Sequence, residues 1–272
     1  MIELRDIGKT FRVAKRNKGV AAAFRSLFHR EYDEVHALDG ISFKVAEGEI
    51  AGFIGPNGAG KSTAIKIMSG ILVPDAGECT VNGVVPWKNR PRYVGRIGVV
   101  FGQRTQLWWD VPVIDSFELL RDIYKTSEDA FRENLAELSE VLELGPLLKT
   151  PLRQLSLGQR MRCEIAASLL HSPEVLFLDE PTIGLDAVSK LAVRRFIIHL
   201  NKTKGITVIL TSHDMNDIEA LTDRIILIGK GNILYDGSLN TIKERYKDPA
   251  GGDEVRHIEE IIASLYQEEG AL

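Results

Sequence analysis

The chain has 272 residues, and 34 Lys and Arg against 38 Asp and Glu leave a net charge of −4, which gives no electrostatic reason to expect nucleic-acid binding. Hydrophobic residues make up 44%, enough for a core without disulfides or metal, and the two cysteines, Cys79 and Cys163, form neither a disulfide framework nor paired zinc ligands. No apolar run approaches the roughly 20 residues of a membrane-spanning helix, and the first residues lack the apolar segment of a signal peptide, so we expect a soluble, cytoplasmic protein.

The first part of the chain predicts a small antiparallel β flank. Residues 2–4, 41–45 and 80–81 are short β-rich runs beside Gly and Asn turns. Between the first two lies an insertion, 13–35, in which apolar residues recur at helical spacing among basic ones. Such a basic amphipathic helix either lies against a membrane surface or is simply solvated. The basic residues are Lys15, Arg16, Lys18, Arg25 and Arg30, and the apolar ones are Phe24, Leu27 and Phe28.

The main body of the chain alternates between apolar strands and helices. Five short runs are apolar nearly throughout, as expected for strands buried on both faces of a parallel sheet. Helical stretches such as 62–69 and 189–201 separate them, which indicates an α/β layered fold. The five predicted strands are 50–54, 97–101, 175–178, 207–210 and 225–228.

Residues from about 112 to 172 interrupt this alternation. The segments 116–124, 128–144 and 160–170 carry apolar residues at helical spacing and little strand character, so we expect a helical subdomain inserted in the α/β domain, or extra helices without a distinct role. We therefore predict one domain over 1–246 and a helical tail over 247–272. The tail begins at the Pro- and Gly-containing break 248–253 and has Val255, Ile258, Ile262 and Leu265 on one face, which packs either on the domain or on a partner.

A nonapeptide after the strand 50–54 fits the pattern G-x-x-x-x-G-K-[ST], and a helix-forming run follows it. The glycines let successive N–H groups point at phosphate oxygens, and the helix N-terminus adds partial positive charge. Lys61 is expected to reach the β- and γ-phosphates, and the Ser62 hydroxyl to bind Mg²⁺. A plain Gly-rich turn is the alternative. The predicted nucleotide contacts are Gly55, Pro56, Asn57, Gly58, Ala59, Gly60, Lys61, Ser62 and Thr63.

Two adjacent carboxylates, Asp179 and Glu180, end the strand 175–178. Neighbouring residues of a strand point to opposite sides, so we expect the pair to divide its work. Asp179 would complete the Mg²⁺ shell through water, and Glu180 would orient or deprotonate the attacking water.

Together with the run LSLGQ at 155–159, these motifs resemble the nucleotide-binding subunit of ATP-binding cassette (ABC) transporters. The family signature is LSGGQ, so only Leu157 departs from it, and Ser156, Gly158 and Gln159 are kept. The run precedes a predicted helix, so that Ser156 stands where a helix N-terminus offers N–H groups and a hydroxyl to a phosphate.

Four further landmarks follow from the resemblance. It implies that Gln103 contacts the metal and the attacking water and senses a transmembrane partner. It implies that Asp186, in the sequence GLD, belongs to the loop that bridges two subunits. It also implies that His213 contacts the γ-phosphate and that Phe11 stacks on adenine. The alternatives are a satisfied histidine after a strand and an ordinary core aromatic.

The resemblance covers residues 2–239 and implies the whole architecture: a P-loop NTPase core with a mostly parallel sheet, an antiparallel β flank and a helical subdomain. It also implies a head-to-tail dimer that sandwiches two ATP molecules with Mg²⁺, and catalysis by positioning and charge stabilisation. The partner would be an integral membrane permease on another polypeptide, which would place the chain on the inner face of the cell membrane.

The runs at 101–124 and 211–228 look like those of exporter-type (ABC-2) ATPases, which suggests a bacterial exporter of drug, lipid or polysaccharide. Polysaccharide exporters have an insertion similar to 13–35. Trp108 and Trp109 either form part of a groove for the permease or pack the subdomain. A soluble ABC ATPase that remodels a macromolecular complex is the alternative function. A nucleotide switch without hydrolysis is a third, against which the intact Glu180 and His213 count.

Overall fold

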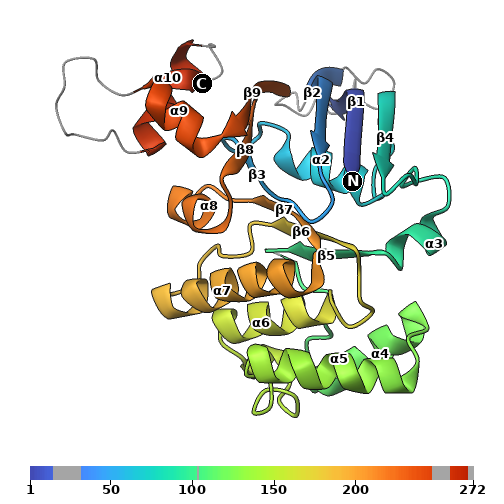
Figure 1. The fold of residues 1–272 in the computed structure, drawn as a ribbon. Coiled ribbons are helices and arrows are strands. Elements are labelled where there is room, and N and C mark those ends of the chain that lie inside the picture. Colours follow the sequence, from blue (N-terminus) through green and yellow to red (C-terminus); the bar gives the residue numbers. More distant parts are fainter. Residues whose placement is uncertain (15–31, 103, 247–257, 269–272) are drawn as a thin grey trace, which may run out of the picture.

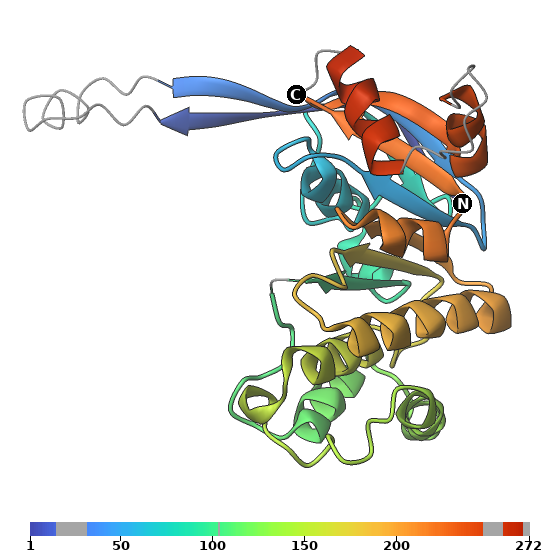
Figure 2. The same cartoon turned by 90° about the vertical axis from the view of Figure 1, so that its left-hand side faces the viewer.

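The structure is a computed structural model, and it describes residues 1–14, 32–102, 104–246 and 258–268. Its first sheet has three antiparallel strands in the order β2-β1-β4. Figure 2 shows β1 and β2 running on together as a two-stranded ribbon that extends away from the body of the molecule. The strands are β1 (Ile2–Ala14), β2 (Tyr32–Val45) and β4 (Ala76–Val81).

The second sheet has six strands in the order β5-β6-β7-β3-β8-β9. Its first five strands are parallel, and β9 pairs antiparallel with β8. The central strands are buried on both faces, which is why their sequences are continuously apolar. The strands are β3 (Ile50–Ile54), β5 (Ile97–Phe101), β6 (Val175–Asp179), β7 (Thr207–Thr211), β8 (Arg224–Gly229) and β9 (Asn232–Ser238).

Helices cover this sheet and build a separate layer beneath β5 and β6. In Figure 1 that layer, the helical subdomain, lies at the end of the molecule farthest from both termini. It contains α4 (Val113–Tyr124), α5 (Glu128–Val141), the 3₁₀ turn η1 (Leu152–Gln154) and α6 (Leu157–Ala167). The remaining helices are α2 (Lys61–Met68), α3 (Arg90–Val94), α7 (Ala187–Lys204), α8 (Met215–Leu221), α9 (Leu239–Arg245) and α10 (Ile258–Glu268). The expected P-loop NTPase fold class is confirmed.

The ends of the predicted helices differ from those in the structure by up to three residues, and two of the differences have a clear local cause. The helix predicted to reach residue 144 ends at Val141, because Glu143 takes a left-handed backbone with φ of 51°. The last helix of the subdomain begins at Leu157 rather than 160, because Ser156 caps its first turn.

The two ends of the predicted insertion at 13–35 belong to the ribbon formed by β1 and β2. Residues 13–14 and 32–35 continue the pairing of β1 and β2, with Ala14 opposite Tyr32, and Arg12 forms an ion pair of 3.1 Å with Glu34 across the strands. These positions are therefore strand and not part of a separate segment. The expected basic helix, with Lys15 to Arg30, lies outside the described residues.

The core has two parts, one on each face of the six-stranded sheet. Alternate residues of β6 show this division: Val175 and Phe177 face α2 and the antiparallel sheet, whereas Leu176 and Leu178 face the subdomain and α7. The C-terminal helix α10 joins the latter part, and the Tyr266 hydroxyl donates to the Ile228 carbonyl at 3.2 Å. In the structure, α10 thus packs on its own domain. No helix among the described residues has the length and apolar character needed to cross a membrane.

Candidate functional site

The loop after β3 follows the geometry that its glycines allow. Gly60 caps α2 with φ of 111°, and Gly58 has φ of 84°, both in the left-handed region that favours glycine. At Gly55 a Cβ atom would lie 2.5 Å from the Ile228 carbonyl oxygen, so this position admits no side chain without a shift of β8. The loop is therefore fixed against the sheet at one end and against the helix at the other.

Lys61 is buried within this loop. Its Nζ donates to the carbonyl oxygens of Gly55 at 2.5 Å and Pro56 at 3.1 Å. Burial lowers the pKa of Lys61, while the charges of Glu180 and Asp179 act in the opposite direction. The ammonium thus lies inside the loop, in the field of the two carboxylates.

The two carboxylates at the end of β6 are held by Thr211 on the neighbouring strand. The Thr211 hydroxyl donates to Asp179 Oδ1 at 2.7 Å and accepts from the Glu180 N–H at 2.9 Å. Glu180 lies beyond the strand with a left-handed φ of 57°, a strained conformation for a residue with a side chain. The expectation that the pair would point to opposite sides was wrong, because this backbone turn brings both side chains to the same cavity.

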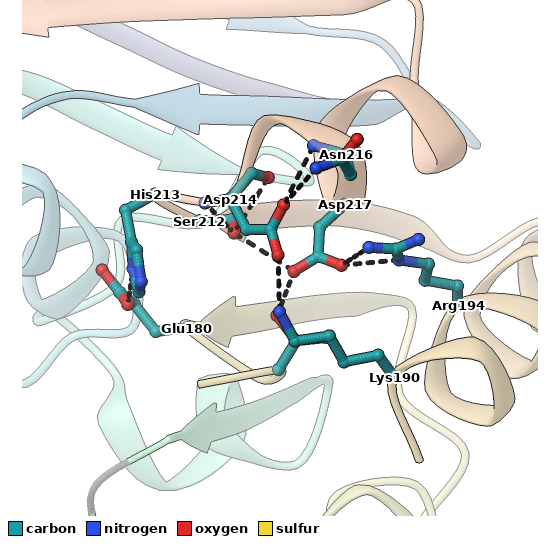
Figure 3. Close-up of polar contacts among 9 residues, drawn as sticks. Glu180, Lys190, Arg194, Ser212, His213, Asp214, Asn216 and Asp217 are labelled. Carbon is teal, nitrogen blue, oxygen red and sulfur yellow. Dashed lines mark hydrogen bonds and ion pairs between the residues drawn. The ribbon is translucent and has the colours of Figure 1, made fainter. Parts of the chain in front are cut away.

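His213 contacts the second carboxylate. Its Nδ1 lies 2.6 Å from Glu180 Oε2, and its side chain is 58% exposed against 18% for Glu180 (Figure 3). An ionised carboxylate only accepts hydrogen bonds, so Nδ1 is the donor in this contact.

Lys61, Asp179 and Glu180 line a cavity of about 460 Å³, whereas His213 and the predicted contacts Gly55, Pro56 and Ala59 do not line it. Gln103 lies outside the described residues, although Gly102 and Arg104, its neighbours in sequence, both line the cavity. The predicted residues that line it are Asn57, Gly58, Gly60, Lys61, Ser62, Thr63, Asp179 and Glu180. Those that sequence reasoning missed are Val35, Ala37, Lys66, Ile71, Phe101, Gly102 and Arg104.

Some of the cavity-lining residues that were not predicted could have been found from the sequence pattern, and others could not. Lys66 stands four residues after Ser62 on the same helix, so helical periodicity places it on the same side. Val35 and Ala37 come from the ribbon, and only the pairing of β1 with β2 brings them there. Phe11 is directly opposite Val35 in that pairing, so its ring lies on the same face as the cavity although it does not line it.

The LSLGQ run and Asp186 lie apart from this cavity. The Ser156 hydroxyl accepts from the Gln159 N–H at 3.2 Å, and the Gln159 side chain accepts from the Ser156 N–H at 2.9 Å, which completes a capping box at the start of α6. A Cβ atom on Gly158 would collide with the side chain of Ser189, whose N–H and hydroxyl both donate to Asp186. The run and the start of α7 are thus packed into one unit, and the structure does not bring them to the loop 55–63, hereafter the P-loop, of the same chain.

The oxygen donors in the cavity suit a small hard cation. The Ser62 hydroxyl and the Asp179 carboxylate both line it. Among the described residues no cluster of three His, Cys, Asp or Glu forms a closed metal cage. Proteins commonly bind Mg²⁺ in such an open way, by one or two protein oxygens together with waters and substrate phosphates.

Known proteins match both the sequence and the fold. The model of the ABC transporter family matches residues 38–183. The linearmycin resistance ATP-binding protein LnrL of Bacillus subtilis is 34% identical over 83% of this chain and 71% of its own length. The doxorubicin resistance ATP-binding protein DrrA of Mycobacterium tuberculosis is 38% identical over 79% of this chain and 64% of its own length.

Among solved structures, one match is the ATP-binding cassette MJ0796 in a dimeric post-hydrolysis state bound to ADP and Pi. It superposes on this chain with a TM-score of 0.73 and is 26% identical in sequence. The match covers 88% of this chain and 99% of that one. The P-loop, the paired carboxylates and His213 therefore stand in the fold in which such cassettes hold their nucleotide. The chain belongs to the ABC transporter family and is one of its ATP-binding cassettes, an ATPase.

Proposed function

We propose that the chain hydrolyses ATP in the cavity between its P-loop and Glu180 and that this powers a separate membrane permease of an exporter. One observation carries the proposal: a single cavity is lined by Lys61, Ser62, Asp179 and Glu180, and His213 contacts the last of them.

Each residue has a role that its position supports. The N–H groups of the loop and the Lys61 ammonium bind the phosphates, and Glu180 orients the attacking water and accepts its proton. Ser62 and Asp179 would hold Mg²⁺, which would supply positive charge to neutralise the phosphate oxygens. Phe11 packs against the adenine. His213 holds Glu180 in place through the contact between its Nδ1 and Glu180 Oε2.

A second copy of the chain completes the site. Ser156, Gly158 and Gln159 are remote from the P-loop of their own chain, and Ser156 lies at a helix N-terminus of a kind that suits a phosphate. A head-to-tail dimer would bring them to the partner's nucleotide, and the related cassette MJ0796 is dimeric.

Export is the direction that the relatives favour, since two of them are named for resistance to linearmycin and doxorubicin. Trp108 and Trp109 are 58% and 46% exposed and do not fill the subdomain core, which leaves them available to a permease on the inner side of the membrane. The alternative of a soluble remodelling ATPase predicts no such membrane partner.

The test is Glu180→Gln, which keeps the shape of the side chain but removes the base. We expect ATP binding to persist, turnover to fall below detection and an ATP-dependent dimer to accumulate on a sizing column. Glu140→Gln, on the exposed side of α5, is the matched control and should behave as wild type. Normal turnover by Glu180→Gln would refute the catalytic assignment, and a monomer with bound ATP would refute the ATP-sandwich dimer.

A second experiment tests the proposed permease partner. The chain should retain a membrane subunit from detergent extracts, and Trp108→Ala should reduce this retention.

A further inference from the structure

A buried carboxylate contacts the two segments that carry Glu180 and His213. Asp217, on α8, has 0% of its surface exposed. A buried charge is unfavourable unless hydrogen bonds and an opposite charge compensate it. Arg194 on α7 supplies the charge, with its Nε 2.5 Å from Asp217 Oδ1 and its Nη2 on the same oxygen.

The other oxygen of Asp217 joins the two segments that carry the catalytic pair. The Thr182 hydroxyl donates to Oδ2, and Thr182 stands two residues after Glu180. The Ser212 hydroxyl also lies 3.4 Å from Oδ2 and shares its one proton between this oxygen and the Asp214 carbonyl, which is 3.4 Å away as well; Ser212 directly precedes His213. One carboxylate oxygen therefore anchors both segments.

A second connection runs from α7 to the same loop. Lys190 forms an ion pair of 2.5 Å with Asp214, the residue after His213, and Asp214 in turn caps α8 by accepting from Asn216. Figure 3 shows the two connections side by side, with Arg194 and Lys190 reaching toward Asp217 and Asp214. The segment that carries His213 is thus held from both its ends.

Stability alone does not account for this arrangement. Buried ion pairs often contribute no more to folding than apolar side chains of the same volume, because desolvation offsets their attraction. What such a pair does supply is a defined geometry with directional hydrogen bonds. Here that geometry fixes the separation of two segments whose side chains meet at 2.6 Å.

We propose that Asp217 is a positioning residue for ATP hydrolysis, which sets the contact between Glu180 and His213 through Thr182 and Ser212. The inference rests on the proposed roles of Glu180 and His213. It requires that loosening this anchor lowers kcat while leaving ATP affinity intact, because Asp217 and Thr182 contact neither the P-loop nor its cavity.

Thr182→Val tests this without removing the buried charge, since valine has nearly the shape of threonine and lacks only the hydroxyl. We expect kcat to fall about 10-fold, as for other small displacements of a reacting group, with KM and the ATP dissociation constant unchanged. Thr182→Ser, which keeps the hydroxyl, should restore the wild-type kcat. Asp217→Asn should resemble Thr182→Val in kcat if the variant folds.

Glu49→Gln is the matched control, because Glu49 forms a half-buried ion pair with Arg224 far from the cavity. The melting temperature of the Glu49→Gln variant reports what the loss of such an ion pair does to stability. The kcat of this variant per ATP-binding site should equal that of wild type. A wild-type kcat in Thr182→Val, an equal loss in Thr182→Ser, or an equal loss in Glu49→Gln would each overturn the inference. Normal turnover in Glu180→Gln would instead refute the proposed function, so the two failures are distinguishable.

Discussion

Gly60 needs to be glycine for two reasons, its backbone conformation and the space around it. Its φ of 111° is unfavourable for any L side chain, and a Cβ atom there would lie 2.4 Å from the Ala37 carbonyl oxygen. Gly58 has a positive φ of 84° but open space around it. We therefore expect Gly60→Ala to lower stability and ATP affinity more than Gly58→Ala, which should cost only the backbone term of about 1–2 kcal/mol.

Gly145→Ala serves as the control, since no atom lies within 4 Å of its added Cβ and its φ is not positive. Chemical denaturation and equilibrium nucleotide binding of the three variants should give the order Gly60, Gly58, Gly145 from most to least affected. An unaffected Gly60→Ala would mean that the loop can relax away from β2.

Residues within one local motif were predictable, whereas residues joined by tertiary packing were not. Of the nine consecutive residues predicted as nucleotide contacts, all but Gly55, Pro56 and Ala59 line the cavity. The network around Asp217 involves three segments separated in sequence, and no spacing rule connects Thr182, Arg194 and Asp217. The predicted orientation of the Glu180 side chain was wrong, because the side chains of a strand alternate between its two faces only while the backbone stays extended, and Glu180 has a left-handed backbone.

At the scale of elements, one aromatic pair joins the helical subdomain to the sheet. The ring of His171, after α6, stacks on Tyr124 of α4 with centroids 3.9 Å apart, and its Nε2 lies 2.9 Å from the Ile97 carbonyl on β5. Its Nδ1 is buried and has no hydrogen-bond partner among the described residues. Protonation would thus place a buried charge and an unsatisfied donor between the two layers.

This contact predicts a pH dependence of stability. Burial lowers the pKa of His171, against the smaller effect of the Ile97 carbonyl, so the unfolded chain takes up the proton at a higher pH than the folded one. Stability must then fall as pH drops below about 6.5, by up to about 1.4 kcal/mol per pH unit until the folded-state pKa is reached. His171→Phe keeps a stacking ring and should lose this component of the slope in urea unfolding between about pH 7.5 and 5.5.

His199→Gln, which removes an exposed imidazole from α7, controls for the loss of a histidine as such. Parallel pH slopes in wild type and His171→Phe would show that His171 takes no part in acid unfolding.

The buried strands were predictable nearly to the residue, because a strand covered on both faces is apolar throughout and ends where polarity returns. β1 and β2 were not, since their outer halves form an exposed ribbon whose polar residues, such as Arg12 and Glu34, show no such pattern. Cross-strand pairing, rather than burial, extends these strands, and a sequence does not reveal it directly.

At the scale of the whole molecule, the structure separates two parts that the family resemblance assigns to one reaction. Lys61 lies in the cavity, and Ser156 caps a helix away from it. If both act on one ATP, they must come from different copies. Two chains that are each inactive for a different reason should then restore activity when mixed.

We expect Lys61→Ala and Ser156→Ala chains to be inactive alone and to regain activity together. In a mixed head-to-tail dimer one site has both defects, while the other combines the intact P-loop of one chain with the intact Ser156 of its partner. Random mixing makes half of the dimers mixed, so the ATPase rate should reach about a quarter of wild type. Mixing Lys61→Ala with a chain that carries both substitutions leaves no intact site and should give no recovery. Equal rates in the two mixtures would show that the site is not shared between copies.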